Sequence, residues 1–512
     1  MLLSWLSPAF LIVGLCGFEI LLFHSMGKRP RAATSAASAS HSGPGPEKHA
    51  QKSKGEWPAH VYQPVPLASK DGFRNITEIS NYMDRAWVDI FDSAGAGGET
   101  RMAAMRGHCG AGVELATQYS GKGTAETCFL HMRQKIEFEG LQQAQGSTWV
   151  ATTCFDSKPA CLKALKQHDG PCIFGAMESV LTKEAQLELD HLAPAKSQNL
   201  DEKKKAYSSM ATYLESNLPQ VMPDDHKAVC ARHSESKTKK VLCKVWPSPS
   251  GRSGAGMMRS KLWVAGQDCR DVSRRGHCEG FAGKFTRCYK VWIHMLRKAR
   301  PEMFIHEITV SKQAAATLAE DVGDLFVLHT IKGLCPTMLG CPTVRPRMYT
   351  VGILKGVAVS TGSWQDFMEL CGNKKCVIDG SAYVLAPHED RLRVARLASQ
   401  RKGWYTPEDT MPNLEDMCTP LEIGRLEAWQ QKHKASASPG KPFICDVQQS
   451  DGFGSVSDMA PCLTSHGKLV LGNSADANKS EMTIAIGAEH MLMMGEPRLK
   501  HIRNCRVASF LI

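Results

Sequence analysis

The stretch KLWVAGQDCRDVSRRGHCEGFAGKFTRCYKVWIHMLRKARPEMFIHEITV, residues 261–310, carries the pattern that decides the fold. It begins with a short apolar run, residues 262–265, and a glycine-containing loop that carries Cys269. A helical segment separates this run from a second apolar run, residues 303–305, which leads to Glu307. Two apolar runs joined by a helix predict neighbouring parallel strands. We therefore expect the Cys269 thiol and the Glu307 carboxylate at one edge of an α/β sheet, which is where such enzymes place reactive groups.

A second strand-to-helix turn lies upstream. Residues 113–119 are typical of a strand, and the loop that follows contains Ser120, Gly121, Gly123 and Thr124 before a helix begins. Glycines at such a turn let the backbone approach a ligand, and the helix start favours polar or anionic groups. The pattern predicts a ligand site at this loop, although Ser-Gly-x-Gly is a weak signal when it stands alone.

In chain order a second strand is predicted at residues 148–153, and it leads to Cys154, Phe155 and Asp156. In doubly wound folds an acidic residue at the end of the second strand binds the ribose hydroxyls of a cofactor. Asp156 is the acidic candidate for this position.

Three segments of the chain resemble, in the same order, three motifs of the cytosine-5 DNA methyltransferases. In that family a Pro-Cys loop carries the nucleophile, a Glu-Asn-Val strand end carries the acid, and a Gln-x-Arg-x-Arg segment follows. The corresponding residues here are Cys269, Glu307, and the pair Arg345 and Arg347. The resemblance implies a Rossmann-like S-adenosylmethionine-dependent methyltransferase fold with a small target-recognition domain.

The resemblance extends to the cofactor, S-adenosyl-L-methionine. The loop at Ser120 to Thr124 is similar to the family's Phe-x-Gly-x-Gly loop, which binds this cofactor. Residues 173–178 are similar to the family's third segment, with Ala176 at the place of an aspartate that contacts the adenine. Glu178 is the candidate replacement for that aspartate.

The chemistry implied by the resemblance explains why these residue types occur together. Carbon-5 of cytosine is a poor nucleophile, so the Cys269 thiolate would add at carbon-6 while Glu307 protonates or hydrogen-bonds N3. Arg345 or Arg347 would stabilise charge on the base carbonyl or hold a phosphate. A base within a duplex cannot reach such a site, so the nucleotide must be flipped out.

Each candidate also has an ordinary interpretation. Cys269 could be a buried structural thiol, Glu307 a surface carboxylate, and Arg345 and Arg347 part of a solvated loop. We predict methyl transfer to cytosine in DNA; a catalytically decayed homologue that only binds DNA, and an RNA cytosine-5 methyltransferase, are the alternatives.

Composition bounds these predictions. The 512 residues are 43% hydrophobic and 22% charged, which is an ordinary globular composition with room for two or three domains. The net charge of +11 favours a polyanionic partner but is too modest to identify one. The 19 cysteines form no Cys-x-x-Cys pair, so neither a zinc site nor a secreted disulfide framework is indicated. A monomer in a reducing compartment is expected, and a DNA substrate would place it in the nucleus.

Changes in composition divide the chain into six parts. The first contains an apolar run, residues 2–23, which could contact a membrane, could direct the chain to an organelle, or could reflect an unreliable translation start. The expected parts are a hydrophobic segment and linker (1–60), an N-terminal helix and cofactor-binding half (61–180), a charged insertion (181–260), a catalytic half (261–360), a target-recognition region of mixed loops (361–440) and a C-terminal return to the main domain (441–512).

Overall fold

The computed structural model describes residues 72–75, 78–79, 99, 113–119, 121, 123–138, 149–166, 172–217, 230, 261–267, 270–273, 277–357, 374–386, 388–401, 403, 412–435, 441–449, 457–462, 467–473, 479, 482–486, 489–490 and 493. The hydrophobic N-terminal segment 1–60, including residues 2–23, lies outside these ranges. Among the helices that are described, none combines the length and apolar character needed to cross a bilayer.

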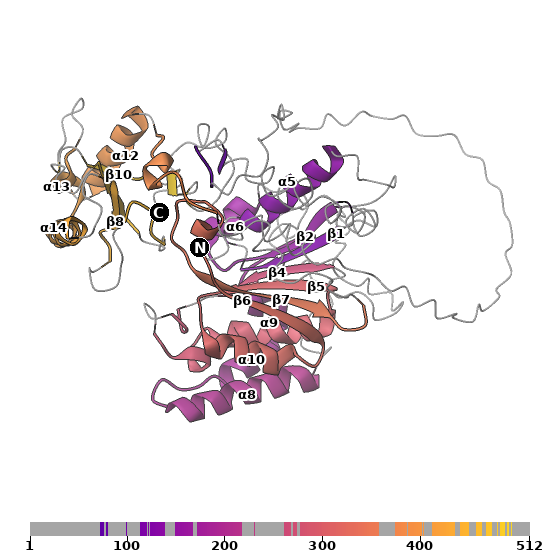
Figure 1. Cartoon of the computed structure of the whole chain (residues 1–512). Helices are drawn as coiled ribbons and strands as arrows, with labels where there is room; N and C mark the ends of the chain where they lie inside the picture. The colour runs from indigo at the N-terminus through magenta and orange to yellow at the C-terminus, as the bar shows by residue number, and fades with distance from the viewer. Residues whose placement is uncertain are drawn as a thin grey trace, which may run out of the picture.

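A seven-stranded sheet lies at the centre of the main domain, in the order β3-β2-β1-β4-β5-β7-β6 (Figure 1). Neighbouring strands from β3 to β5 are parallel, whereas β7 runs antiparallel to both β5 and β6. The strands are β1 (Val113–Gln118), β2 (Trp149–Phe155), β3 (Cys172–Phe174), β4 (Leu262–Gly266), β5 (Met303–Ile308), β6 (Phe326–Leu334) and β7 (Arg347–Leu354).

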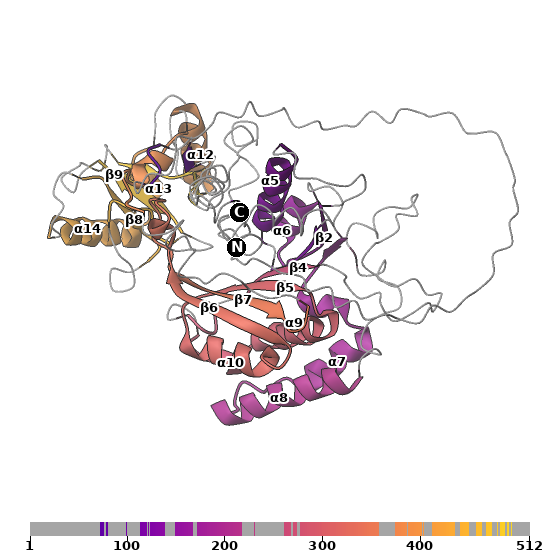
Figure 2. The ribbon, with the colours of Figure 1, turned by 45° about the vertical axis from the view of Figure 1, so that its right-hand side comes forward.

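Helices cover both faces of this sheet. In Figures 1 and 2, α5 and α6 lie on one face and α8, α9 and α10 lie on the other. The helices are α5 (Thr124–Phe138), α6 (Pro159–Leu165), α7 (Lys183–His191), α8 (Leu200–Asn217), α9 (Thr286–Ala299) and α10 (Lys312–Val322). This mixed, mostly parallel, Rossmann-like architecture confirms the predicted fold class.

The residues of β4 and β5 explain why these strands are central. Every residue of both strands is buried, as expected for strands covered on both faces. On the α9 face, Trp292 packs edge-on against Phe304 with ring centroids 6.0 Å apart. The residue that caps the carboxyl end of α9 is Arg300, which adopts a left-handed conformation (φ 46°) and is followed by Pro301. The chain therefore turns directly from α9 into β5.

Residues 181–260, which we expected as a charged insertion, contribute α7 and α8 to the main domain. Leu189 of α7 and Tyr207, Met210 and Leu214 of α8 are buried in the same hydrophobic cluster as α9. The charged residues of α8 lie mainly on its exposed side. This segment is therefore part of the crossover between β3 and β4 as well as a charged surface.

A smaller unit follows the main sheet. It contains a three-stranded antiparallel sheet in the order β10-β9-β8, with three helices packed around it. Its elements are α12 (His388–Arg401), α13 (Leu414–Met417), α14 (Pro420–Lys434), β8 (Phe443–Asp446), β9 (Leu469–Gly472) and β10 (Thr483–Ile484). The region 361–440 thus contains helices where we expected mixed loops. The strands of 441–512 share a core with those helices, although we expected them to return to the main domain.

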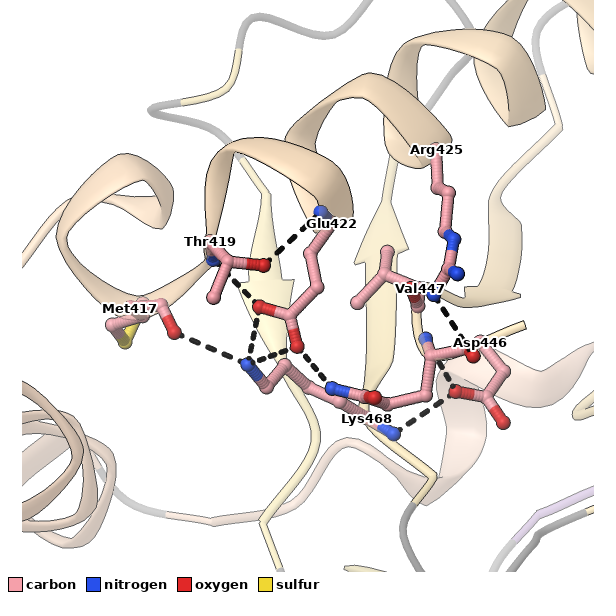
Figure 3. A network of polar contacts seen from close by, with 8 residues as sticks. Met417, Thr419, Glu422, Arg425, Asp446, Val447 and Lys468 are labelled. Atoms are coloured by element: carbon pink, nitrogen blue, oxygen red, sulfur yellow. Dashed lines mark hydrogen bonds and ion pairs between the residues drawn. The ribbon is translucent and has the colours of Figure 1, made fainter. Parts of the chain in front are cut away.

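A buried ion pair fastens helix to sheet within the smaller unit (Figure 3). The Lys468 ammonium lies 2.8 Å from a carboxylate oxygen of Glu422, whose side chain is 5% exposed. Glu422 also accepts a hydrogen bond from the backbone N–H of Thr419, and the Thr419 hydroxyl accepts one from the Glu422 N–H. This capping box begins α14, and the backbone N–H of Lys468 donates to the carboxylate of Asp446, the last residue of β8.

Candidate active site

Glu307 lies near the end of β5, where it meets the beginning of β7. Because β7 is antiparallel to β5, its first residue, Arg347, lies beside the carboxyl end of β5. The Arg347 Nε is 2.9 Å from Glu307 Oε1, and the Arg345 Nη2 is 3.4 Å from the same oxygen. The side chains of Glu307 and Arg345 are each 2% exposed and that of Arg347 is 9% exposed. The carboxylate is thus enclosed by two guanidinium groups.

The burial of these three side chains decides between the interpretations left open by the sequence. Glu307 is not a surface carboxylate, and Arg345 and Arg347 do not belong to a solvated loop. Burying charges is costly unless they are paired. The structure therefore brings together three of the four predicted catalytic residues in a single ion-paired group.

Cys462, from the segment between β8 and β9, is a fourth member of this group. Its sulfur accepts hydrogen bonds from Arg345 Nη1 and Arg347 Nη2, each at 3.3 Å. Burial alone would raise the pKa of the Cys462 thiol, but the charges and hydrogen bonds of the two arginines outweigh it and hold the pKa below its usual range. The two arginines therefore favour the thiolate form of Cys462, which completes the arginine group from the smaller unit.

Backbone contacts fix the position of Cys462 relative to the arginines. Val344 N–H donates to the Ala460 carbonyl at 2.8 Å, and Ala460 N–H donates to the Pro342 carbonyl at 2.9 Å. These bonds form a short parallel bridge between Thr343 and Ala460, two residues before Cys462. The approach of thiol and arginines is thus set by the main chain.

Cys269, the predicted nucleophile, lies outside the described residues. The residues before it are fixed, because Gln267 N–H donates to the Glu307 carbonyl at 3.1 Å and its side-chain oxygen is 3.2 Å from His306 Nε2. Burial lowers the pKa of His306 to about 3, so its ring is neutral. His306 in turn stacks on Trp292, with ring centroids 4.9 Å apart.

The residues after Cys269 are fixed as well. The Arg270 guanidinium lies over the ring of Phe285, 3.7 Å from its centroid. The Asp271 carboxylate accepts a hydrogen bond from Phe285 N–H at 2.7 Å. A Cβ atom at Gly283 would lie 2.0 Å from that carboxyl carbon, so only glycine fits there. Contacts on either side of Cys269 thus fasten its loop to β5 and to the start of α9.

The predicted cofactor loop is a tight turn between β1 and α5. Gly121 and Gly123 have φ of 60° and 90°, a left-handed region that favours glycine. The Asp156 carboxylate accepts a hydrogen bond from Gly121 N–H at 2.9 Å and another from Lys158 N–H at 2.8 Å. The structure thus brings Asp156, after β2, to the glycine loop. Ser120 and the side chain of Thr124 lie outside the description.

Glu178 is placed differently. It lies in a short 3-10 helix after β3 (Met177–Val180), where its carboxylate is 3.5 Å from Arg287 Nε and 3.1 Å from the Cys288 sulfur. Both partners belong to α9. Its described contacts thus connect it to that helix, and no described contact joins it to Gly121 or Asp156.

Two buried polar side chains flank the cofactor loop and test whether a ligand fits there. Gln118, the last residue of β1, is fully buried, and neither atom of its amide has a hydrogen-bond partner among the described residues. Glu126, in the first turn of α5, is also fully buried. One of its oxygens accepts a hydrogen bond from the Thr117 hydroxyl, and the other has no partner in the part of the chain that the structure describes. Buried polar groups are normally satisfied. These atoms therefore fit a site that a polar ligand completes.

The sequence had not indicated Gln118, Glu126, His306 or Cys462 as members of the site. Cys462 follows a proline, but nothing in the local sequence predicted its contact with the arginines. No group of side chains suited to a metal ion occurs among the described residues.

Comparisons with known proteins give no match to a family model and no match among curated proteins. Among solved structures, the chain is similar to the Dnmt2 methyltransferase of S. pombe (11% identity, 57% of this chain and 67% of that chain, TM-score 0.30). It is also similar to the Entamoeba histolytica methyltransferase EhMeth (10%, 59% and 70%, TM-score 0.27) and to a variant of Spodoptera frugiperda DNMT2 (9%, 63% and 80%, TM-score 0.28). At these values the likeness concerns the fold, and the argument for function rests on the site.

Proposed function

We propose that this protein transfers a methyl group from S-adenosylmethionine to carbon-5 of cytosine in DNA. The observation that carries the proposal is the buried group of Glu307, Arg345 and Arg347 at the end of β5, beside the strand that leads to Cys269. An acid, two cations and a thiol-bearing loop at the edge of a mostly parallel sheet are the groups that this reaction needs.

In the proposed mechanism, the Cys269 thiolate adds to carbon-6 of a flipped-out cytosine and forms a carbon–sulfur bond. Glu307 provides a proton or hydrogen bond to N3, so that the electron pair displaced from the 5,6 double bond is held in an enamine whose nucleophilic end is carbon-5. S-adenosylmethionine, when bound, would supply the methyl group, with S-adenosylhomocysteine as the leaving group. A base such as water then takes the carbon-5 proton, the carbon–sulfur bond to Cys269 breaks as the 5,6 double bond re-forms, and any proton given to N3 returns to Glu307.

The arginines have two roles in this mechanism. They hold the Glu307 carboxylate in a fixed direction, and they place positive charge where the base carbonyl would become more negative. Because these donors are fixed before the substrate arrives, little reorganisation is needed during the reaction. Gln267 and His306 position the beginning of the loop that carries the nucleophile.

For the cofactor, the glycine turn at Gly121 and Gly123 would lie against its polar end, and Asp156 would accept hydrogen bonds from the ribose hydroxyls. Each Asp156 oxygen already accepts one backbone hydrogen bond, and a carboxylate oxygen can accept a second. A role for Glu178 at the adenine would require it to leave its contacts with Arg287 and Cys288.

The test is covalent trapping with DNA that contains 5-fluorocytosine, from which the fluorine cannot leave. We expect a denaturation-resistant adduct with the wild type and at least a hundredfold less with Cys269→Ser; Cys278→Ser, at an exposed cysteine, is the matched control. If neither wild type nor control forms an adduct, the chain is a decayed homologue. An adduct that forms with RNA and not with DNA would change the substrate class.

A further inference from the structure

Glu126 has an unusual environment for a carboxylate at the start of a helix. Acidic residues in a first turn normally point to solvent and interact with the helix dipole. Glu126 is instead fully buried between α5 and β1. Its only described hydrogen bond comes from the Thr117 hydroxyl, which also lies 3.3 Å from the Thr153 carbonyl. The other carboxylate oxygen is buried and has no donor among the residues that the structure describes.

The surroundings of Glu126 indicate what could satisfy that oxygen. Thr117 lies one residue before the end of β1, and Glu126 lies three residues after Gly123, so their hydrogen bond closes the base of the glycine turn. A buried carboxylate without a counter-ion is strongly unfavourable. No cation contacts it among the described residues, and a positively charged group of a bound ligand would satisfy it.

We propose that Glu126 binds the α-ammonium group of the amino-acid end of S-adenosylmethionine. This inference rests on the proposed function, because it needs that cofactor at the glycine turn. The amino-acid end carries a carboxylate and an ammonium group on one carbon atom. The N–H groups at the start of α5 suit the carboxylate, and Glu126 in the same turn suits the ammonium. Asp156, on the neighbouring strand, serves the ribose at the other end of the turn.

Binding to the full-length protein by isothermal titration calorimetry tests this assignment with two ligands. One is S-adenosylhomocysteine, and the other is its deaminated analogue, which keeps the carboxylate and replaces the ammonium group by hydrogen. A charge-assisted hydrogen bond is worth about tenfold to a hundredfold in affinity. We expect the wild type to bind S-adenosylhomocysteine more tightly than the analogue by this factor, and Glu126→Gln to bind both ligands equally.

The substitution keeps the shape of the side chain, and its amide oxygen still accepts the Thr117 hydrogen bond, so the fold is retained. The matched control is Thr117→Val, which removes that hydrogen bond and leaves the charge; it should still prefer S-adenosylhomocysteine. If Glu126→Gln keeps the wild-type preference, the assignment is wrong while the proposed function stands. If the wild type binds neither ligand, the proposed function fails and this assignment fails with it.

Discussion

The two polar regions at the carboxyl edge of the sheet differ in how their charges are balanced. At the end of β5, Glu307 contacts two arginines, and those arginines also contact Cys462. Beside the end of β1, Gln118 and Glu126 are equally buried, but both amide atoms of Gln118 and one carboxylate oxygen of Glu126 have no hydrogen-bond partner among the described residues. The first region satisfies its charges within the protein, whereas the second leaves polar atoms that a ligand could satisfy. The proposed methyl transfer would use the first as a preorganised reaction centre and the second as the site of the methyl donor.

Removing the Glu307 carboxylate should have the largest effect on the free energy of unfolding. Glu307→Gln leaves two buried guanidinium groups without their anion, so we expect the free energy of unfolding to fall by about 3–5 kcal/mol in urea titrations. The control is Glu279→Gln, which breaks the partly exposed Lys203–Glu279 pair (3.1 Å) and should cost at most about 1 kcal/mol. Equal losses in both variants would contradict the view that Glu307 is held in a buried ion-paired group.

Removing the thiol should have an intermediate effect. Cys462→Ala deletes a sulfur that accepts hydrogen bonds from both arginines, so we expect a loss of about 1.5–3 kcal/mol in the free energy of unfolding. The pKa of Cys462 is lower in the folded than in the unfolded protein, so its stabilisation is complete above the unfolded pKa and is lost as the pH falls through the folded value. The cost of Cys462→Ala should thus be larger at pH 9 than at pH 6, and a cost that does not change with pH would argue against a thiolate.

The effect that depends most on pH should come from the histidine that contacts Gln267, at the start of the Cys269 loop. The pKa of His306 falls from 6.5 to about 3 on burial, so the unfolded chain binds a proton that the folded chain does not between these values. Stability is therefore full above pH 6.5 and declines as the pH falls toward 3, by up to about 1.4 kcal/mol per pH unit for this residue. His306→Gln should reduce that slope in urea titrations at pH 4 to 6. Measurements at pH 8 report the packing loss alone, and an unchanged slope would show that another group controls acid sensitivity.

Local sequence patterns predicted β1, β2, β4, β5 and the helix α9 of the main domain because these elements are regular. The apolar runs that became β4 and β5 are short and continuous, and the helix between them has a clear apolar face. The same reasoning missed α14, although Thr419, Pro420 and Glu422 form a recognisable capping box at its start. We had relied on apolar periodicity there, and this helix has a weak apolar face.

The site could be predicted only in part. The order of motifs identified Glu307, Arg345 and Arg347 as candidates. Nothing in their local sequence shows that β7 runs antiparallel to β5, and this pairing is what brings the three side chains together. Cys462 depends on contacts between segments far apart in the chain, so no local pattern reveals it. Glu126 looked like an ordinary acidic residue near a helix start, and only the structure shows its burial.

The bridge between Thr343 and Ala460 has a consequence for biosynthesis. The main sheet is complete at β7, more than a hundred residues before Cys462 leaves the ribosome. Until that later segment has been translated and has docked, the arginines lack one of their contacts. A nascent or prematurely terminated chain can thus form the main sheet while Arg345 and Arg347 still lack their hydrogen bonds to Cys462. The complete arginine group forms only late in synthesis.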